Sequence, residues 1–297
     1  MDGILIIDKP AGITSHDAVM RVRRVLGTKR VGHTGTLDPL ATGVLVLLIG
    51  NATRLAKFID KDEKEYEALV KFGSETETGD VTGRQKAEGG TQKADVVRLL
   101  PTIDWEEVFS KFRGETLQTP PMYSAKKVAG KKLYELARAG VEIERKAVPV
   151  TIRELELIGQ TDSEIRIRVS CSAGTYIRTL AEEIGREVGL GAHLVELRRT
   201  RAGKYGSLDA VALAEFESSE LPLQALKSIT ETVEHLPELN LTAERSAKTR
   251  NGLSTRVDEV KFSHGSAVRM LDENSELIAI GIYDGDQKVV KPKIVLV

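Results

Sequence analysis

Hydrophobic residues along the chain follow two patterns, one typical of buried strands and one typical of amphipathic helices. Unbroken apolar runs at residues 3–7 and 44–49 predict two buried strands. Between these runs, valine and leucine recur at helical spacing over residues 19–26, with arginines largely on the other faces. Ser15 is the expected N-cap of this helix, and Gly27 is the expected C-terminal stop.

The middle of the chain mixes strand and helix patterns. From Tyr66 to Phe72, apolar residues alternate with charged ones, which predicts a half-buried strand. A polar, glycine-containing loop is expected at residues 73–90, followed by two helices, the second beginning at Asp104. Other strands are predicted at residues 148–157, 164–171 and 193–200, and other helices at 52–59, 133–139 and 175–188. Because no regular strand–helix–strand repeat appears, we expect an α+β fold with a mixed, largely antiparallel sheet flanked by helices.

Two regions depart from this pattern. Residues 118–132 are broken by prolines and rich in lysine, which predicts a mobile arm inserted at about residues 113–146. An acidic stretch at residues 205–240 precedes a tail, residues 241–297, whose short alternating runs and glycines predict a small β-barrel. We therefore expect one large domain over residues 1–240 and a small domain formed by the tail.

The composition is that of an ordinary globular protein. The chain has 297 residues, of which 41% are hydrophobic and 29% charged. Its apolar runs are far shorter than the roughly 20 residues that a membrane-spanning helix needs, and Met1-Asp2-Gly3 begins no signal peptide. A single cysteine, Cys171, suits a reducing compartment. We expect a cytoplasmic protein that is not bound to a membrane.

Charge is distributed unevenly, although the net charge is only −1. Lysine and arginine are in excess over residues 1–57, 113–146 and 166–204, and acidic segments separate these three. The basic segments could converge on one positive face, as expected of a protein that binds a phosphate backbone. Solvated charge spread evenly over the surface is the alternative interpretation.

The motifs argue against several familiar kinds of active site. The sequence contains no G-x-x-x-x-G-K-[ST], and the glycines of residues 32–43 do not follow G-x-G-x-x-G, so neither a nucleoside triphosphate nor NAD is indicated. The five histidines have no metal-ligand spacing, and the single cysteine offers no partner for zinc. We therefore predict neither a cofactor nor a metal.

The stretch GHTGTLDPLATG, residues 32–43, places one carboxylate directly before a buried strand. Pro39 biases Asp38 away from helical dihedral angles, and the glycines permit tight turns and close approach of a ligand to the backbone. Asp38 is therefore either a carboxylate that faces a ligand or a turn residue whose side chain bonds its own backbone. His33 has the same two interpretations.

This stretch, in its G-x-L-D-P-x-A-T-G core, resembles the catalytic motif of the TruB family, the bacterial tRNA pseudouridine-55 synthases. Further matches follow in the order of the family: Asp8-Lys9-Pro10-x-Gly12-x-Thr14-Ser15, Lys64-x-Tyr66, Pro120-Pro121-Met122-Tyr123-Ser124-Ala125, Gly174-Thr175-Tyr176-Ile177-Arg178-Thr179-Leu180, Gly191-Ala192-His193-Leu194 and Leu197-Arg198-Arg199. Together they cover about residues 3–205, and several spaced motifs are far more specific than one.

The resemblance implies the isomerisation of uridine to pseudouridine. The bond from N1 to C1′ breaks, the uracil rotates, and C5 is joined to C1′, which requires neither a cofactor nor a redox change. Asp38 would be the essential ionised carboxylate, acting either as a nucleophile or as a base that removes the 2′ proton of the sugar. Arg178 would be its cationic partner, and a close opposite charge lowers the pKa of a carboxylate.

The resemblance also implies four supporting residues. Tyr66 would stack on the uracil and is a candidate for accepting the C5 proton, and Tyr176 and Leu197 would line the pocket. Lys9 would shape the floor beside the Asp38 loop. Taken alone, the aromatic and apolar residues among these are equally well explained as strand or core residues.

The implied substrate is the T stem-loop of tRNA, in which the target uridine is stacked and must be flipped out. His33 could fill the space that the base leaves. The arm offers four lysines that could bind phosphates: Lys126, Lys127, Lys131 and Lys132. The tail resembles the small PUA-type RNA-binding barrel that bacterial members of the family append.

Two other functions are compatible with these motifs. One is a tRNA-folding assistant, whose main role is to unfold and reanneal tRNA. The other is an RNA N-glycosylase, which would break the same bond but release free uracil. The resemblance to the TruB family implies a monomer without an obligate protein partner.

Overall fold

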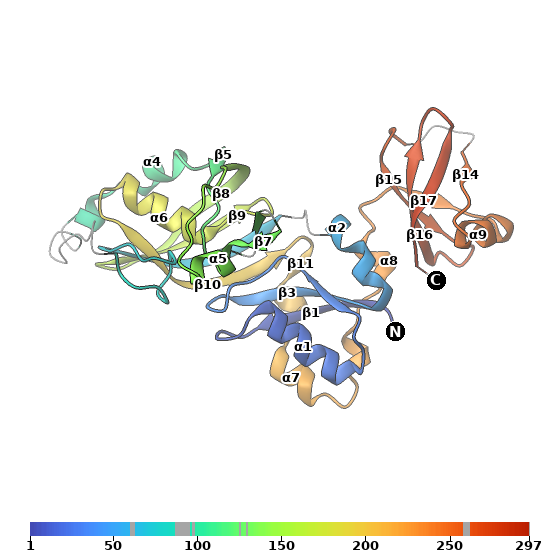
Figure 1. Ribbon diagram of the computed structural model, residues 1–297, viewed down its shortest axis with the longest axis horizontal. Helices are drawn as coiled ribbons and strands as arrows, with labels where there is room; N and C mark the ends of the chain where they lie inside the picture. The colour runs from blue at the N-terminus through green and yellow to red at the C-terminus, as the bar shows by residue number, and fades with distance from the viewer. Residues whose placement is uncertain are drawn as a thin grey trace.

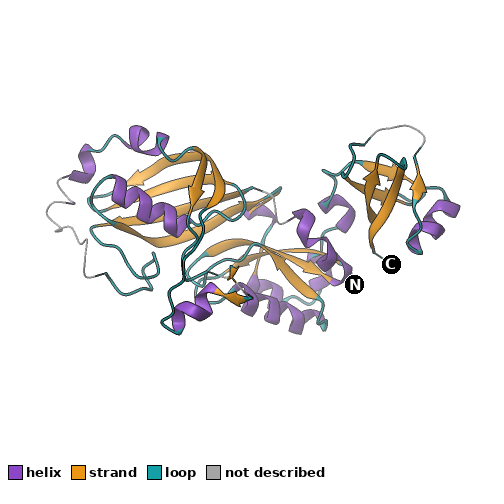
Figure 2. Cartoon of the chain, turned by 45° about the horizontal axis from the view of Figure 1, so that its top comes forward, coloured by secondary structure: helices purple, strands orange, loops and turns teal. Residues whose placement is uncertain are grey.

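The structure is a computed structural model that describes residues 1–59, 63–86, 96, 99–124, 126–128, 130–257 and 262–296. Within this part of the chain, a large mixed sheet with its helices forms the main body, and a smaller sheet lies beside it at the C-terminal end (Figure 1). Helices lie on the outside of the strands, as Figure 2 shows. The predicted α+β class with a mixed sheet is confirmed.

The strands of the main body are β1 (Gly3–Lys9), β2 (Val31–Thr34), β3 (Thr42–Ile49), β4 (Lys64–Phe72), β5 (Gly114–Gln118), β6 (Lys127–Val128), β7 (Lys131–Lys132), β8 (Val148–Gln160), β9 (Glu164–Cys171), β10 (Ala192–Ala202), β11 (Tyr205–Gly206) and β12 (Val211–Ala212). Its α-helices are α1 (Ser15–Leu26), α2 (Ala56–Ile59), α4 (Trp105–Ser110), α5 (Leu133–Arg138), α6 (Ile177–Glu187), α7 (Leu213–Ser218) and α8 (Ile229–Thr232). Its 3-10 helices are η1 (Gly50–Leu55), η2 (Leu100–Thr102), η3 (Ser207–Asp209) and η4 (Pro222–Ala225).

The smaller sheet has five strands in the order β13-β15-β16-β17-β14. Its elements are β13 (Glu238–Asn240), α9 (Ala243–Arg250), β14 (Thr255–Arg256), β15 (Ala267–Leu271), β16 (Leu277–Asp284) and β17 (Val289–Val295). The tail therefore forms a compact β-structure of its own, and the strand at residues 238–240 completes it.

Two halves of the ten-stranded main sheet meet where β3 lies beside β10. The strand order is β12-β1-β3-β10-β4-β9-β8-β5, with β2 on β3 and β11 on β10. β3 and β10 run parallel and pair only between residues 42–43 and 198–199, whereas β10 pairs with β4 along most of its length. This short junction comes directly after the loop that carries Asp38, so the loop lies between the two halves.

β1 and β3 are buried on both faces, which explains their unbroken apolar sequences. Leu5 and Ile7 of β1 face a core that also contains residues of α1, α6 and α7. Ile4 and Ile6 alternate with them and face a second core, which includes Ile280 and other residues of the small sheet. The tail therefore shares a hydrophobic core with the main body.

β4 is half-buried, as its alternating sequence predicts. Every second residue from Lys64 to Phe72 is buried, and the strand pairs antiparallel with β9 and β10. Side chains of α4 and α6 cover the buried face; the rings of Phe72 and Trp105 lie 5.6 Å apart. Tyr66 belongs to this covered face.

The predicted N-cap of α1 is wrong by one residue. Thr14 caps the helix: its hydroxyl accepts a hydrogen bond from the Asp17 amide, and the Asp17 carboxylate accepts one from the Thr14 amide. The Ser15 hydroxyl instead accepts a hydrogen bond from the Leu37 amide at 2.8 Å and donates to the Leu37 carbonyl at 3.1 Å. Ser15 thus ties α1 to the Asp38 loop, while Gly27 ends the helix as predicted.

Two other predicted helices differ in detail. Residues 52–59 fall in a 3-10 helix followed by one turn of α-helix. Of the two helices expected after residue 90, the second is α4 with Asp104 as its N-cap, and the first falls largely outside the described residues. Among the helices in the described part of the chain, none is both long and apolar enough to cross a membrane.

Candidate functional site

The loop between β2 and β3 carries Asp38, and hydrogen bonds to the backbone of the loop hold it in place. The Gly12 amide donates to the Pro39 carbonyl at 2.8 Å, and Ser15 holds both backbone groups of Leu37. Within the described residues, no backbone amide donates to the Asp38 carboxylate; it bonds a guanidinium instead. The interpretation of Asp38 as a turn residue that bonds its own backbone is therefore wrong.

Arg178, the second residue of α6, directs its guanidinium at Asp38. Its Nε lies 2.9 Å from Asp38 Oδ2. The other two nitrogens donate to backbone carbonyls, Nη1 to that of Thr78 at 2.8 Å and Nη2 to that of Tyr123 at 2.7 Å. The Arg178 side chain is 4% exposed, whereas that of Asp38 is 35% exposed. One buried guanidinium thus joins the Asp38 loop, the loop after β4 and the segment before β6.

A second carboxylate, Asp80, lies behind this pair. It is buried, and its Oδ2 is 3.8 Å from Arg178 Nε. The hydroxyls of Thr78 and Thr82 donate to its other oxygen. Burial raises the pKa of Asp38; the Arg178 charge is the largest opposing influence, and Asp80 adds to the rise. The expected lowering by Arg178 is present, but burial outweighs it.

Asp38 and Arg178 lie in the wall of a cavity of ≈ 420 Å³, within the roughly 300–1,000 Å³ typical of small-molecule sites. The cavity combines charged, hydroxyl and apolar groups. Its lining consists of Gly35, Thr36, Leu37, Asp38, Lys64, Tyr66, Ser124, Ala173, Gly174, Thr175, Tyr176, Ile177, Arg178, Leu197 and Arg199. Both halves of the main sheet therefore contribute to it.

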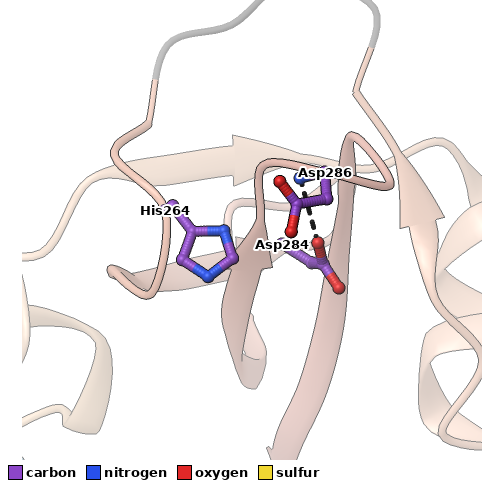
Figure 3. Close-up of side chains that lie close together, drawn as sticks. All are labelled: His264, Asp284 and Asp286. Atoms are coloured by element: carbon purple, nitrogen blue, oxygen red, sulfur yellow. Dashed lines mark hydrogen bonds between the residues drawn. The ribbon is translucent and has the colours of Figure 1, made fainter.

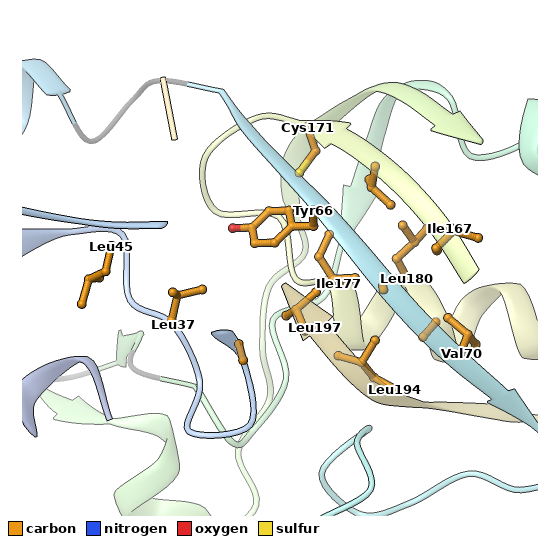
Figure 4. Close-up of a cluster of buried hydrophobic side chains, with 14 of the residues drawn as sticks. Leu37, Leu45, Tyr66, Val70, Ile167, Cys171, Ile177, Leu180, Leu194 and Leu197 are labelled. Atoms are coloured by element: carbon orange, nitrogen blue, oxygen red, sulfur yellow. The ribbon is translucent and has the colours of Figure 1, made fainter. Parts of the chain in front are cut away.

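Tyr66 and Leu197 form part of the apolar wall. Both side chains belong to the buried cluster drawn in Figure 4, in which the Tyr66 hydroxyl points away from Val70 and Ile167. Burial raises the pKa of Tyr66, and Arg199 opposes this rise through its charge and a hydrogen bond. The phenol is therefore protonated at neutral pH.

Arg199 is a cavity residue that the sequence-based prediction missed. Its buried side chain donates from Nε to the Val44 carbonyl at 2.7 Å and from Nη2 to the Gly35 carbonyl at 3.1 Å. Strand alternation puts Leu197 and Arg199 on one face of β10, and this signal could have revealed it. At Gly43, where φ is +98°, a Cβ would lie 2.2 Å from the Arg199 carbonyl oxygen, so the junction requires glycine.

Three more polar residues of the site were not predicted. Lys64 has the same phase as Tyr66 on β4, so alternation again offered a signal. Ser124 lines the cavity from the segment before β6. Asp80 lies in a loop that reaches the site only because it forms a bridge with Leu194 of β10, and its sequence gives no hint of this contact.

Tyr176, which was predicted to line the pocket, lines the cavity and is the N-cap of α6. The Gln118 side chain holds its backbone: the amide of Tyr176 donates to Gln118 Oε1 at 2.7 Å, and Gln118 Nε2 donates to the Tyr176 carbonyl at 3.1 Å. Through these two bonds, the end of β5 at Gln118 holds the N-terminal end of α6 in place.

Lys9, at the end of β1, bonds the turn that follows it and is not among the described residues that line the cavity. It is fully buried, and its Nζ donates to the carbonyls of Pro10 and Ile13, each at 2.8 Å. Burial lowers its pKa to about 8; Asp38 opposes this shift and Arg199 adds to it. The Asp8-to-Gly12 turn is thus held in shape beside the site.

His33 and the four arm lysines are not among the described residues that line the cavity. His33 lies on β2 opposite Leu47 of β3. Lys127 pairs with Lys132 and Lys131 with Val128 in the β6–β7 hairpin, which Lys126 directly precedes. The fold therefore gathers the four lysines on one hairpin, and their role in binding stays a prediction.

One group of residues in the described part of the chain brings metal-ligating atoms within 4.8 Å of one another: His264, Asp284 and Asp286 (Figure 3). The group closes a turn of the small sheet. His264 Nδ1 accepts a hydrogen bond from the Gly285 amide, and Asp284 accepts from the Asp286 amide and from Lys291 Nζ.

Two models of known protein families together match most of the main body. Residues 23–177 match the model of the TruB family pseudouridylate synthase (N terminal domain), and residues 178–236 match the tRNA pseudouridylate synthase B C-terminal domain. A tRNA pseudouridine synthase B from Aromatoleum aromaticum is 42% identical over 288 residues, which cover 96% of this chain and 90% of the relative. The chain belongs to the TruB family.

Other comparisons extend the TruB family likeness to nearly the whole chain. A tRNA pseudouridine synthase B from Heliobacterium modesticaldum is 42% identical over 284 residues, covering 95% of this chain and 90% of the relative. A chain in the solved structure described as "Crystal Structure of a Cbf5-Nop10-Gar1 Complex" superimposes with a TM-score of 0.72 at 25% identity, covering 99% of this chain and 85% of that one. The fold of this TruB family member, tail included, therefore recurs in a solved structure.

Proposed function

We propose that this protein converts the uridine at position 55, in the T loop of tRNA, into pseudouridine. Membership of the TruB family and the relatives named tRNA pseudouridine synthase B support the reaction and the substrate. The observation that carries the proposal is the Asp38–Arg178 ion pair in the wall of a cavity whose volume suits a nucleoside.

Asp38 supplies the reactive carboxylate. Arg178 bonds Oδ2, and more than a third of the Asp38 side chain remains accessible from the cavity side, so the carboxylate can reach a substrate. In one route an oxygen attacks C1′ while the N1–C1′ bonding electrons pass to the uracil. The uracil then rotates, C5 attacks C1′ and the carboxylate leaves. C5 loses its hydrogen as a proton, and N1, which left with the bonding electrons, takes up a proton.

In the second route Asp38 acts as a base. It removes the 2′ proton while the uracil leaves with the N1–C1′ electrons, which gives a glycal. C5 of the rotated uracil then bonds to C1′, C2′ regains a proton, C5 loses one, and N1 takes one up. Both routes need an ionised carboxylate and both end in the same product, so the geometry of Asp38 and Arg178 serves either.

Tyr66 stacks on the uracil in our proposal. Its raised pKa keeps the phenol protonated at neutral pH, so the basic phenolate form is scarce and stacking is favoured over acceptance of the C5 proton. Leu197 and Tyr176 complete the walls, and Lys9 supports the loop beneath. Tyr66→Phe is then expected to keep most of the activity, and Tyr66→Ala to lose it.

RNA contacts outside the cavity are assigned to two regions. We propose that residues 1–240 form the catalytic domain and bind phosphates through the β6–β7 hairpin, while residues 241–297 form a PUA-like RNA-binding domain. Several cations of the tail are paired locally, Lys248 with Glu244 and Lys291 with Asp284. We therefore assign the tail a modest share of the affinity for tRNA.

The test is the release of tritium from C5-labelled uridine in a full-length tRNA transcript. The wild-type protein is expected to release one tritium for each pseudouridine found by nucleoside mass spectrometry. A transcript with cytidine at position 55 is the matched control and should release none. No release from the uridine transcript would remove the proposed function, and free uracil in place of pseudouridine would replace it with that of an RNA N-glycosylase.

A further inference from the structure

The segment before β6 contributes a buried hydroxyl to the cavity that the proposed reaction does not use. Ser124 is 4% exposed, and its Oγ has no hydrogen-bond partner among the described residues. Buried polar groups without partners are uncommon, because an unmade hydrogen bond leaves the group without compensation for its lost water. Since Ser124 lines the cavity, a ligand inside it can supply the missing partner.

Ser124 lies near the reactive carboxylate because Arg178 links the two. Arg178 Nε bonds Asp38, and Nη2 bonds the carbonyl of Tyr123, the residue directly before Ser124. Nε and Nη2 share one edge of the planar guanidinium, the edge that binds two oxygens side by side. The Asp38 carboxylate and the Tyr123 carbonyl are therefore neighbours, and Ser124 follows immediately.

The backbone of Ser124 is also fixed. Its carbonyl accepts a hydrogen bond from the Tyr134 amide at 3.1 Å, at the start of α5. Together with the bond from Arg178 to Tyr123, this contact holds the residue from both sides. The position of Ser124 in the cavity wall therefore does not depend on a freely moving segment.

The part of the substrate beside Asp38 is the sugar. In either route of the proposed function, Asp38 acts at C1′ or at the proton on C2′, so the ribose lies against the carboxylate and the uracil lies against Tyr66 and Leu197. The polar group of the ribose attached to this region is the 2′-hydroxyl, which can both donate and accept. A serine hydroxyl matches it in both respects.

We propose that the Ser124 hydroxyl binds the ribose 2′-hydroxyl of the flipped uridine and so makes the cavity select RNA over DNA. The 2′-hydroxyl is the group by which a protein can distinguish the two nucleic acids at a single nucleotide. This inference rests on the proposed function, because it takes the substrate to be a uridine with its sugar at Asp38.

The test combines a protein substitution with a substrate substitution. Ser124→Ala is compared with Ser246→Ala, which removes another buried hydroxyl without a described partner, 2% exposed, in α9 of the tail. Each is made in an Asp38→Asn background, which prevents turnover. Dissociation constants are measured by fluorescence anisotropy for two T-arm stem-loops that differ only in uridine or 2′-deoxyuridine at the target position.

Ser124→Ala is expected to weaken binding of the all-ribose stem-loop about three- to tenfold and to leave binding of the 2′-deoxy stem-loop unchanged. Ser246→Ala should change neither. Because the Ser124 hydroxyl has no hydrogen-bond partner among the described residues, Ser124→Ala should also leave the thermal midpoint unchanged or slightly higher, which a purely structural serine would not do.

Two results would overturn the inference. An equal loss on both stem-loops would assign Ser124 to another part of the nucleotide, and no loss on either would remove the contact. Failure of the proposed function itself looks different: the wild-type protein would then release no tritium from the all-ribose RNA. The two failures are therefore distinguishable.

Discussion

Two aspartate–arginine pairs in the main body have the same chemistry but different surroundings. In the pair of Asp8 and Arg198, two guanidinium nitrogens bond two carboxylate oxygens, at 3.1 and 2.6 Å, and the side chains are 32% and 40% exposed. In the pair of Asp38 and Arg178, one nitrogen bonds one oxygen at 2.9 Å, and Arg178 is almost fully buried. In the exposed pair, both oxygens of Asp8 are bonded to Arg198. The buried Arg178 instead divides its donors among Asp38 and two backbone carbonyls.

This difference shows that surroundings determine which carboxylate is chemically available. Water screens the exposed pair, which is worth about 0–1 kcal/mol. The two aspartates are similarly exposed, at 32% and 35%, but Arg178 is buried, and removing the partner of a buried charge leaves it uncompensated at a cost of about 3–5 kcal/mol. Asp38 lines the cavity and keeps unused acceptor capacity and a raised pKa, whereas Asp8 does not line that cavity and both of its oxygens are bonded to Arg198.

The largest expected effect separates the two aspartates by activity. Asp38→Asn should lower the rate of pseudouridine formation about 10²–10⁴-fold, because the neutral amide can act neither as a nucleophile nor as a base. Asp8→Asn is the matched control and should stay within about threefold of the wild type. Tritium release under single-turnover conditions measures both. Equal losses in the two variants would show that burial does not distinguish the pairs.

The next effect is a shift in pH dependence. Because the Arg178 charge opposes the rise in the pKa of Asp38, a variant with a weaker contact, Arg178→Lys, should have a still higher Asp38 pKa. The reactive form is ionised, so activity is lost as the pH falls through this pKa, and the acid limb of kcat/KM should move to higher pH. Arg198→Lys should leave the limb in place. An unchanged limb in Arg178→Lys would contradict the role given to Arg178.

Neighbouring arginines of β10 provide a test of stability. Arg199→Gln removes the donors of two backbone carbonyls, that of buried Val44 and that of half-buried Gly35, and should lower the free energy of unfolding by about 2–4 kcal/mol. Arg198→Gln, one position away on the opposite face, should lower it by less than about 1 kcal/mol. Urea unfolding measures both values. Similar losses would mean that strand alternation does not determine the contribution of each arginine.

The smallest effect concerns the exposed pair alone. A double-mutant cycle of Asp8→Asn and Arg198→Gln should give a coupling energy of about 0.2–1 kcal/mol. Because both side chains are partly exposed, the coupling should decrease when the salt concentration is raised. Urea unfolding at low and high salt measures it. A large, salt-independent coupling would show that this pair behaves like a buried one.

Much of the fold could be predicted because its signals are local. The apolar runs, the alternation from Tyr66 to Phe72 and the stop at Gly27 depend on residues near one another in sequence, and the corresponding elements are present. The prediction of Ser15 as the N-cap of α1 was wrong because two neighbouring residues, Thr14 and Ser15, can both cap a helix. Only the contact of Ser15 with Leu37, 22 residues away, assigns the cap to Thr14.

The site shows the same division. Motifs identified Asp38, Arg178 and Tyr66, and strand alternation could have added Lys64 and Arg199. No local signal leads to Asp80 or to a role for Ser124, because contacts between segments distant in sequence bring Asp80 to Arg178 and Ser124 to the cavity. Two side chains can be assigned to one strand face from sequence, but two loops cannot be assigned to one cavity in that way.

The sequence by itself predicted most of the elements, the family and the main candidate residues of the site, because periodicity and motif spacing are properties of the chain. The tertiary structure decided that burial outweighs Arg178 in its effect on the pKa of Asp38, and that one guanidinium joins three separate segments. The physical reason is that burial and long-range hydrogen bonds depend on which distant segments exclude water from a group. This burial and these hydrogen bonds around the site exist only once the two halves of the sheet meet at Gly43 and Arg199.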